Sequence, residues 1–170
     1  MTTSTRAHAR HGGSYPRDGA PPEVLAADAR LRGLTLDMLR MKLADPIEGK
    51  GWDPEQIDLA EREYRRFLVL CLADDNATTV PCEIVDVMWH AHILDTLAYH
   101  RDCEQIFGFY YHHFPYFGMR GDDDAHDLAD SYTQTLVRYE RAFGAPPAGV
   151  WTHEVTGKCT RKACKPQKCR

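Results

Sequence analysis

The stretch from Pro81 to Pro115 holds most of the side chains in this sequence that could do chemistry. It has the sequence PCEIVDVMWHAHILDTLAYHRDCEQIFGFYYHHFP and contains five of the nine histidines, two cysteines and three aspartates. These polar residues are embedded among aromatic and aliphatic ones. Histidine, carboxylate and thiol groups in such a setting are typical of metal and catalytic sites, because burial and close partners perturb their proton affinity.

Helical geometry sorts these side chains onto two faces, because a regular helix turns about 100° per residue. Asp86 and His90 lie one turn apart on one face. The opposite face carries His92, Asp95, Tyr99, Asp102 and Cys103. His90 and His92 point about 200° apart, so they cannot bind the same metal ion while the helix stays regular.

The face that carries His92 predicts one candidate site. Asp95 and Asp102 could orient the imidazole ring or share a cation with it. Asp102 and Tyr99 are the candidate catalytic residues of this face. Cys103 would add a soft ligand and shift the preference toward zinc or copper.

The face that carries Asp86 and His90 predicts another candidate site, since residues four apart can hydrogen-bond or bind one ion together. His112 and His113 are the candidates to complete either site. Two or three histidine and carboxylate ligands with open positions suit zinc hydrolysis or non-haem iron chemistry. The alternative is structural: the Asp86–His90 pair would hold two helices in register, and the paired histidines would bond backbone carbonyls.

Three cysteines form a separate pattern near the C-terminus. Cys159, Cys164 and Cys169 are five residues apart among lysines and arginines, which lower thiol pKa. They are a candidate second site for zinc or Cu(I), although the spacing is at the edge of the usual range. The alternative is a solvated tail with incidental thiols.

The charge of the chain is unevenly distributed. Residues 151–170 carry six basic residues and one acid, which gives +5 and leaves −9 on residues 1–150 from the total of −4. Basic tails of this kind are most often simply solvated, so nucleic-acid binding is not expected.

Helical periodicity covers most of the remaining chain. Asp53 and Pro54 mark a helix start, as an N-cap and a first-turn proline. The charged residues of this helix, Glu61, Arg62, Arg65 and Arg66, are expected to face solvent. Gly33 and Thr35 divide the first helical span, with Thr35 as the N-cap of its second part. A kink or break near Tyr99 is left open for the third span. The helical spans are about 22–44, 54–73, 81–107 and 122–143, and the aromatic segment 109–117 is expected to be a packed loop.

These patterns predict an all-α fold, a compact bundle of about five helices, because no segment shows the alternation of a strand. The bundle is expected over residues 22–151. Residues 1–21 are rich in Gly, Pro, Ser, Thr and Arg and are predicted to be a disordered arm. Residues 152–170 are predicted to be a flexible basic tail.

Length and composition limit the classes of protein to consider. A chain of 170 residues with 43% hydrophobic and 27% charged residues is typical of one globular domain. No apolar run approaches the roughly 18 residues of a membrane span, and the N-terminus lacks the apolar core of a secretory signal. These features predict a cytoplasmic protein with reduced thiols and no membrane partner. The sequence does not indicate a small-molecule or protein partner, or an oligomeric state.

The central stretch resembles a known family. The residues VDVMWHAHIL at 85–94, Tyr99, Asp102–Cys103, Phe107–Gly108 and HHFP at 112–115 resemble the core signature of the glycine-rich domain-containing protein-like family. That family was first catalogued as a domain of unknown function and is best known from larger plant proteins. The resemblance covers about residues 25–150 and implies a helical domain. The chain lacks the glycine-rich C-terminal region, so the roles of the plant proteins do not carry over.

The sequence therefore predicts a small all-α protein with a metal site in its central stretch. The expected ion is zinc, iron or copper, and the expected activity is that of a metal-dependent oxidoreductase or hydrolase of unidentified substrate. Gly-x-Ser-x-Gly, His-Glu-x-x-His and phosphate-binding glycine loops are absent, so no motif identifies the reaction. Two alternatives remain open: a non-enzymatic helical interaction module, and a metal carrier or sensor that uses the cysteine tail.

Overall fold

The protein is helical in a computed structural model that describes residues 15–152. Within that range it has six α-helices and no strand, which confirms the predicted fold class. The helices are α1 (Pro22–Leu31), α2 (Asp37–Ala44), α3 (Pro54–Ala73), α4 (Glu83–Leu94), α5 (Thr96–Phe107) and α6 (Asp122–Phe143). None of the described helices is both long enough and apolar enough to cross a membrane.

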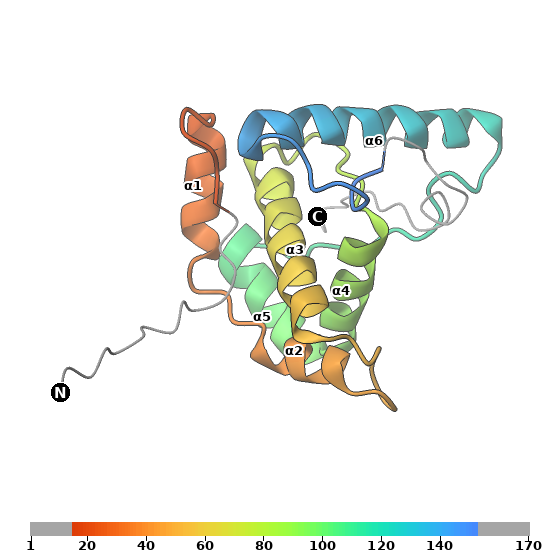
Figure 1. The fold of residues 1–170 in the computed structure, drawn as a ribbon. Coiled ribbons are helices and arrows are strands. Elements are labelled where there is room, and N and C mark those ends of the chain that lie inside the picture. Colours follow the sequence, from red (N-terminus) through yellow and green to blue (C-terminus); the bar gives the residue numbers. More distant parts are fainter. Residues whose placement is uncertain (1–14, 153–170) are drawn as a thin grey trace.

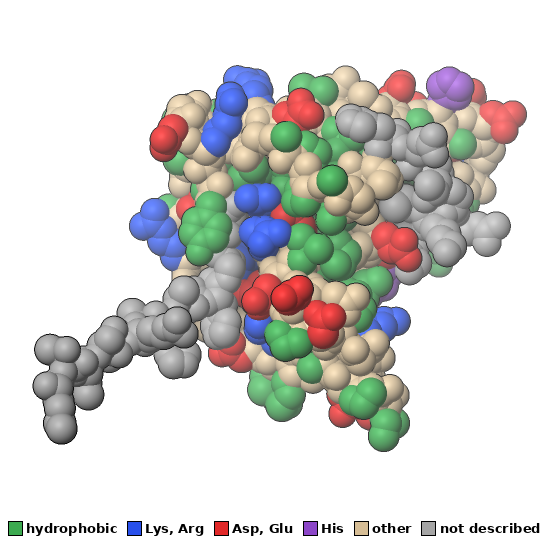
Figure 2. Space-filling model, in the orientation of Figure 1, with side chains coloured by type: hydrophobic (Ala, Val, Ile, Leu, Met, Phe, Trp, Pro, Cys, Tyr) green, Lys and Arg blue, Asp and Glu red, His purple; other side chains and the backbone are tan. Residues whose placement is uncertain are grey.

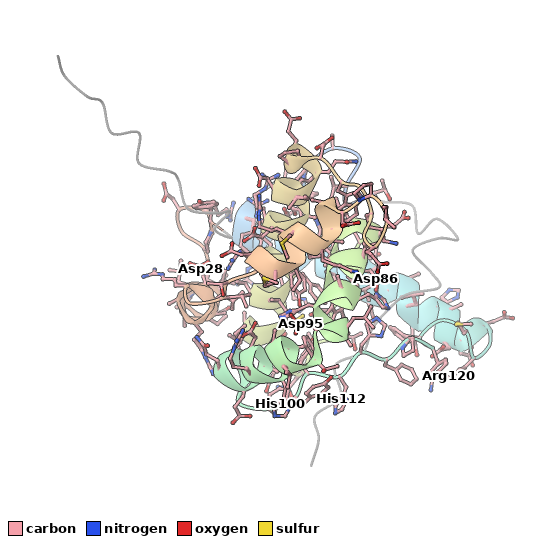
Figure 3. The ribbon with its side chains drawn as sticks, turned by 90° about the horizontal axis from the view of Figure 1, so that it is seen from below. Asp28, Asp86, Asp95, His100, His112 and Arg120 are labelled. Carbon is pink, nitrogen blue, oxygen red and sulfur yellow. The ribbon has the colours of Figure 1, made fainter. Side chains whose placement is uncertain are left out.

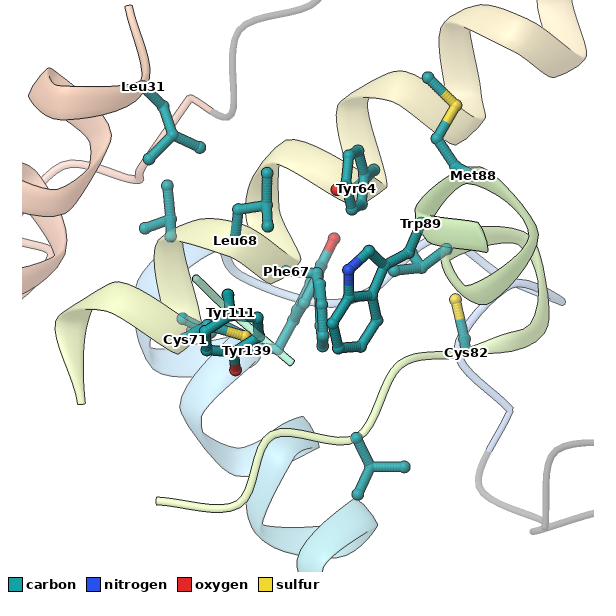
Figure 4. Close-up of a cluster of buried hydrophobic side chains, with 14 of the residues drawn as sticks. Leu31, Tyr64, Phe67, Leu68, Cys71, Cys82, Met88, Trp89, Tyr111 and Tyr139 are labelled. Atoms are coloured by element: carbon teal, nitrogen blue, oxygen red, sulfur yellow. The ribbon is translucent and has the colours of Figure 1, made fainter. Parts of the chain in front are cut away.

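Helix α3 lies at the centre of the fold. It contacts α1, α2, α4 and α6, and Figure 1 shows α6 lying across one end of the other helices. Tyr64, Phe67 and Leu68 of α3 are buried in a core that also contains Trp89 of α4 (Figure 4). The rings of Phe67 and Trp89 have their centroids 5.0 Å apart.

The start of α3 follows the sequence signal closely. The Asp53 carboxylate accepts a hydrogen bond from the Gln56 backbone N–H at 2.9 Å, and Gln56 Oε1 accepts one from the Asp53 N–H at 3.2 Å. This capping box satisfies two backbone donors that have no partner within the helix. The N-cap predicted at Thr35 is wrong: α2 begins after Leu36, whose side chain makes no cap hydrogen bond.

The helix predicted over 81–107 is broken at Asp95, four residues before Tyr99. Asp95 has φ −83° and ψ 73°, which ends α4, and its carboxylate caps α5 by accepting from the Ala98 N–H at 3.3 Å. The same aspartate therefore stops one helix and starts the next. The side chains of α4 and α5 consequently belong to two separate helices.

Two glutamates of α3, Glu61 and Glu63, are buried and paired with arginines. The pattern predicted that Glu61 and Arg65 would face solvent, and this is wrong because both are buried. Glu61 accepts from Arg65 at 2.8 Å and from Arg40 of α2 at 2.6 Å. Arg65 also donates to the Leu34 carbonyl at 2.8 Å. Ions inside a protein are tolerated when they are paired and hydrogen-bonded, and this network ties α3 to the α1–α2 region.

Glu63 connects α3 to the C-terminal end of the described chain. Its carboxylate accepts from the Tyr139 hydroxyl at 2.7 Å and from the Trp151 indole N–H at 2.8 Å. Arg66 supplies the opposite charge at 3.1 Å. Trp151 is buried, so the chain after α6 packs back onto the helices.

The segment 108–121 has no helix or strand and joins α5 to α6. Its end is fixed by Asp124, whose carboxylate accepts from the backbone N–H groups of Gly118 at 2.6 Å and Arg120 at 3.2 Å. The Arg120 guanidinium also pairs with Asp124, at 2.5 Å. On the face shown in Figure 2, acidic and basic side chains are interspersed with small groups of hydrophobic ones.

Replacing Glu63 with alanine is expected to lower the free energy of unfolding by about 3–5 kcal/mol. The substitution leaves Arg66 without its buried carboxylate and removes the acceptor of two buried donors. Urea unfolding measures the effect. The control is Glu104→Ala on the exposed side of α5, which should change the free energy by no more than about 0.5 kcal/mol. Equal effects of the two substitutions would contradict the buried network.

Acid should remove the contribution of Asp124 to stability. The Arg120 side chain and the backbone N–H groups lower the pKa of Asp124 from 3.8 to about 2. The ionised carboxylate therefore stabilises the fold above pH 3.8, and this stabilisation is lost as the pH falls through about 2. Asp124→Asn should have a lower free energy of unfolding than the parent above about pH 4, and this difference should shrink toward pH 2. Urea unfolding at a series of pH values measures it. Asp123→Asn is the matched control. A difference that stays constant over this range would refute the assignment.

Candidate metal site

Asp86 and His90 of α4 lie together with His113 of the segment 108–121. Asp86 Oδ1 is 3.4 Å from His113 Nε2, and Asp86 Oδ2 is 3.3 Å from His90 Nδ1. Each residue has one possible ligand atom within 4.8 Å of the others. In the described range 15–152, this is the single group of three or more His, Cys, Asp or Glu side chains that meets this distance.

The three side chains differ in how far they are buried. Asp86 is 2% exposed and His113 is 9% exposed, whereas His90 is 45% exposed. The carboxylate therefore lies at the inner end of the group, and His90 opens it to solvent. Figure 3 places Asp86 well apart from His112 and His100, so those histidines are not part of the same group.

The positions of the two α4 residues follow from the helix, since residues four apart lie one above the other. The ring of His113 is held by its neighbours instead. Its centroid is 4.9 Å from that of Trp89 and 4.3 Å from that of His90, in edge-to-face contacts. The core residue Trp89 thus forms one wall of the candidate site.

The hydrogen-bond partners of Asp86 favour its ionised form. Burial alone would raise the pKa of Asp86, but the hydrogen bonds from His113 and His90 outweigh it and lower the pKa below its usual value. His90 Nδ1 also lies 2.7 Å from the Asp86 backbone carbonyl, to which it can only donate. The carboxylate is consequently in the form that binds metal ions, while a cation that binds His90 Nδ1 would have to displace its proton.

His92 belongs to a second, fully buried cluster. Its Nδ1 lies 2.9 Å from the Tyr64 hydroxyl and its Nε2 lies 3.2 Å from Asp102 Oδ2. The consistent assignment is that Nε2–H donates to the carboxylate and Nδ1 accepts from Tyr64. Burial lowers the pKa of His92 despite the nearby Asp102. Both ring nitrogens are therefore engaged by the protein.

Asp102 is also paired with Arg101, whose Nε donates to Oδ1 at 2.9 Å. Together with Tyr64 and His92 it forms a chain of side chains from the surface to α3. These contacts suit a buried polar network that orients α4, α5 and α3 relative to one another.

The remaining predicted site residues of the described chain lie outside the group of Asp86, His90 and His113. Tyr99 is buried, and its hydroxyl lies between the Trp89 indole and the Tyr111 carbonyl. Cys103 is buried, and burial raises the pKa of its thiol. The His112 ring packs on Tyr110 at 4.7 Å. The cysteines of the C-terminal pattern, Cys159, Cys164 and Cys169, lie outside the described residues.

Helical geometry correctly predicted that His90 and His92 would be in different clusters. It left open which of His112 and His113 completes either set, and the structure brings His113 to Asp86 and His90. Tyr64 was not identified from the sequence as a partner of His92. It lies on the apolar stripe of α3, where the pattern is that of an ordinary core residue.

A family model described as UCP032817-like matches residues 38–133, more than half of the chain. The chain belongs to this UCP032817-like family. The assignment corrects the resemblance to the glycine-rich domain-containing family, which the match does not support. No curated protein and no solved structure matches the chain. The UCP032817-like region runs from α2 into α6 and includes Asp86, His90 and His113, so the candidate site lies wholly inside it.

The buried cysteines of the helical core are expected to be unreactive in the folded protein. Burial raises the pKa of Cys71 to about 12 and that of Cys103 above its usual value, and thiolates are the reactive form. Alkylation with iodoacetamide at about pH 8, followed by mass-spectrometric mapping, should label both residues only after denaturation. Labelling of either one in the native protein at the rate of a free thiol would contradict its burial.

Proposed function

We propose that Asp86, His90 and His113 bind one divalent transition-metal ion and that this ion forms a catalytic centre. The observation that carries the proposal is the meeting of two imidazoles and one ionised carboxylate from separate parts of the chain. Such a set suits zinc and ferrous iron, whereas magnesium and calcium prefer oxygen ligands.

The distances in the group fit a small ion as well as direct hydrogen bonds. Two ligand atoms bound to zinc at about 2.0–2.1 Å in tetrahedral geometry are about 3.3 Å apart. The Asp86–histidine distances are 3.3 Å from Oδ2 to His90 Nδ1 and 3.4 Å from Oδ1 to His113 Nε2, so they end on different carboxylate oxygens. Direct hydrogen bonds have similar lengths, so metal content is the measurement that separates a metal site from a polar clamp.

A catalytic role is supported by the number of ligands and by the exposure. Structural zinc sites are usually closed by four protein ligands, whereas catalytic sites have three and leave a position for water. Three protein ligands and a half-exposed His90 match the second description. With zinc, the bound water would become acidic enough for hydrolysis near neutral pH. With ferrous iron, two histidines and one carboxylate are the ligands of non-haem oxygenases.

The competing function, a non-enzymatic interaction module, is favoured by one observation. Leu94 and Leu97, on either side of the α4–α5 break, are 82% and 85% exposed. Apolar side chains so open to solvent can mark a protein-binding surface. In an interaction module, Asp86, His90 and His113 would be a hydrogen-bonded clamp. Substitution of Leu94 and Leu97 would then abolish partner binding without affecting metal content.

Metal analysis of the full chain, purified without a histidine tag, tests the proposal. After incubation with zinc or with ferrous iron under anaerobic conditions, we expect about one tightly held ion per chain. His90→Ala and His113→Ala should each weaken the affinity by more than about 10-fold, because each removes a ligand. The matched control is His112→Ala, which changes the neighbouring histidine and should bind as the parent does. Less than about a tenth of an equivalent of every metal tested would refute the proposal.

A further inference from the structure

We propose that Tyr99 is a positioning residue of the metal site and that its hydroxyl sets the place of His113. This inference rests on the proposed function. It assigns to Tyr99 a role through neighbouring groups, because its hydroxyl bonds Trp89 and the Tyr111 carbonyl rather than a proposed ligand.

The Tyr99 hydroxyl joins three parts of the fold at one atom. It accepts a hydrogen bond from the Trp89 indole N–H of α4 at 2.9 Å. It donates one to the backbone carbonyl of Tyr111, in the segment 108–121. Tyr99 itself belongs to α5 and is 2% exposed, so water does not compete for these bonds.

Both of these partners are next to a proposed ligand. Trp89 precedes His90 in α4, and its ring also lies against the ring of His113. Tyr111 is two residues before His113, so its carbonyl fixes the backbone that leads to that histidine. The segment has no helix or strand, so bonds of this kind contribute to where the His113 ring lies. The Tyr99 hydroxyl therefore influences the position of His113 both through the Trp89 ring and through the Tyr111 backbone.

The protonation state of Tyr99 fits this role. Burial raises the pKa of Tyr99 far above its ordinary value, so the hydroxyl stays protonated and can donate to the Tyr111 carbonyl at any working pH. Groups that hold metal ligands in place commonly change metal affinity by about 10–100-fold when they are removed.

Tyr99→Phe, compared with Tyr64→Phe, tests the inference. Both substitutions remove one hydroxyl from a fully buried tyrosine, but the Tyr64 hydroxyl bonds His92 in the other cluster. Zinc affinity is measured by competition with a chromophoric chelator, and ligand geometry by the visible spectrum of the cobalt(II)-substituted protein. Tyr99→Phe should weaken zinc binding about 10-fold or more and change the cobalt spectrum. Tyr64→Phe should keep the parent spectrum and an affinity within about 2-fold of the parent.

The outcomes separate this inference from the proposed function. Failure of the parent protein to bind zinc or cobalt would refute the proposed function itself. A parent that binds, with Tyr99→Phe identical to Tyr64→Phe in affinity and spectrum, would overturn the role of Tyr99 alone. A loss of stability shared by Tyr99→Phe and Tyr64→Phe does not support a positioning role for Tyr99. Only the zinc affinity and the cobalt spectrum distinguish that role from a structural one.

Should Tyr99→Phe fail to fold, the parent protein still decides the question. The indole N–H resonance of Trp89 in the NMR spectrum reports its bond to Tyr99. On saturation with zinc this resonance is expected to shift and its hydrogen exchange to slow, because the ion fixes His113 against Trp89. An unchanged resonance and exchange rate in a zinc-saturated protein would refute the link.

Discussion

The contact between Trp89 and its neighbours connects the core of this protein to its candidate site. One side of the indole packs on Phe67 of α3, at the centre of the fold, and another side faces His113. Its N–H is bonded to Tyr99, so the ring cannot turn without leaving a buried donor unpaired. The position of His113 thus depends on packing that begins at α3, and the site inherits the rigidity of the core.

The same core contains several buried polar side chains that are hydrogen-bonded to one another or to their neighbours. Glu61, Glu63, His92 and Asp102 are all buried, and each has hydrogen-bonding partners from another element or another turn of its helix. Burying such groups without partners would cost more than a small helical fold can offset. With partners, they restrict how α2, α5 and α6 can pack on α3. Asp86 differs from the others in lying beside a half-exposed histidine, which is why it is the candidate for metal chemistry.

The sequence predicted the helices and the separation of His90 from His92, because both follow from a fixed rotation per residue. The choice between His112 and His113 could not be predicted in this way. They are adjacent in a segment whose backbone follows no repeating geometry, so neither periodicity nor spacing defines their directions. Burial of Glu61 was missed for another reason: its charge is balanced by Arg40, which is twenty-one residues away in the sequence. The family resemblance was drawn from motifs between residues 85 and 115, and the match over residues 38–133 corrects it.

The central claim is that one ion is bound by α4 and the segment 108–121 together. X-ray diffraction from crystals grown with zinc, recorded on both sides of the zinc absorption edge, tests it most directly. The claim predicts an anomalous peak within about 2.0–2.2 Å of one donor atom from each of Asp86, His90 and His113. The contradicting result is a zinc-soaked crystal with no peak at this place, in which His90 and His113 remain hydrogen-bonded to Asp86.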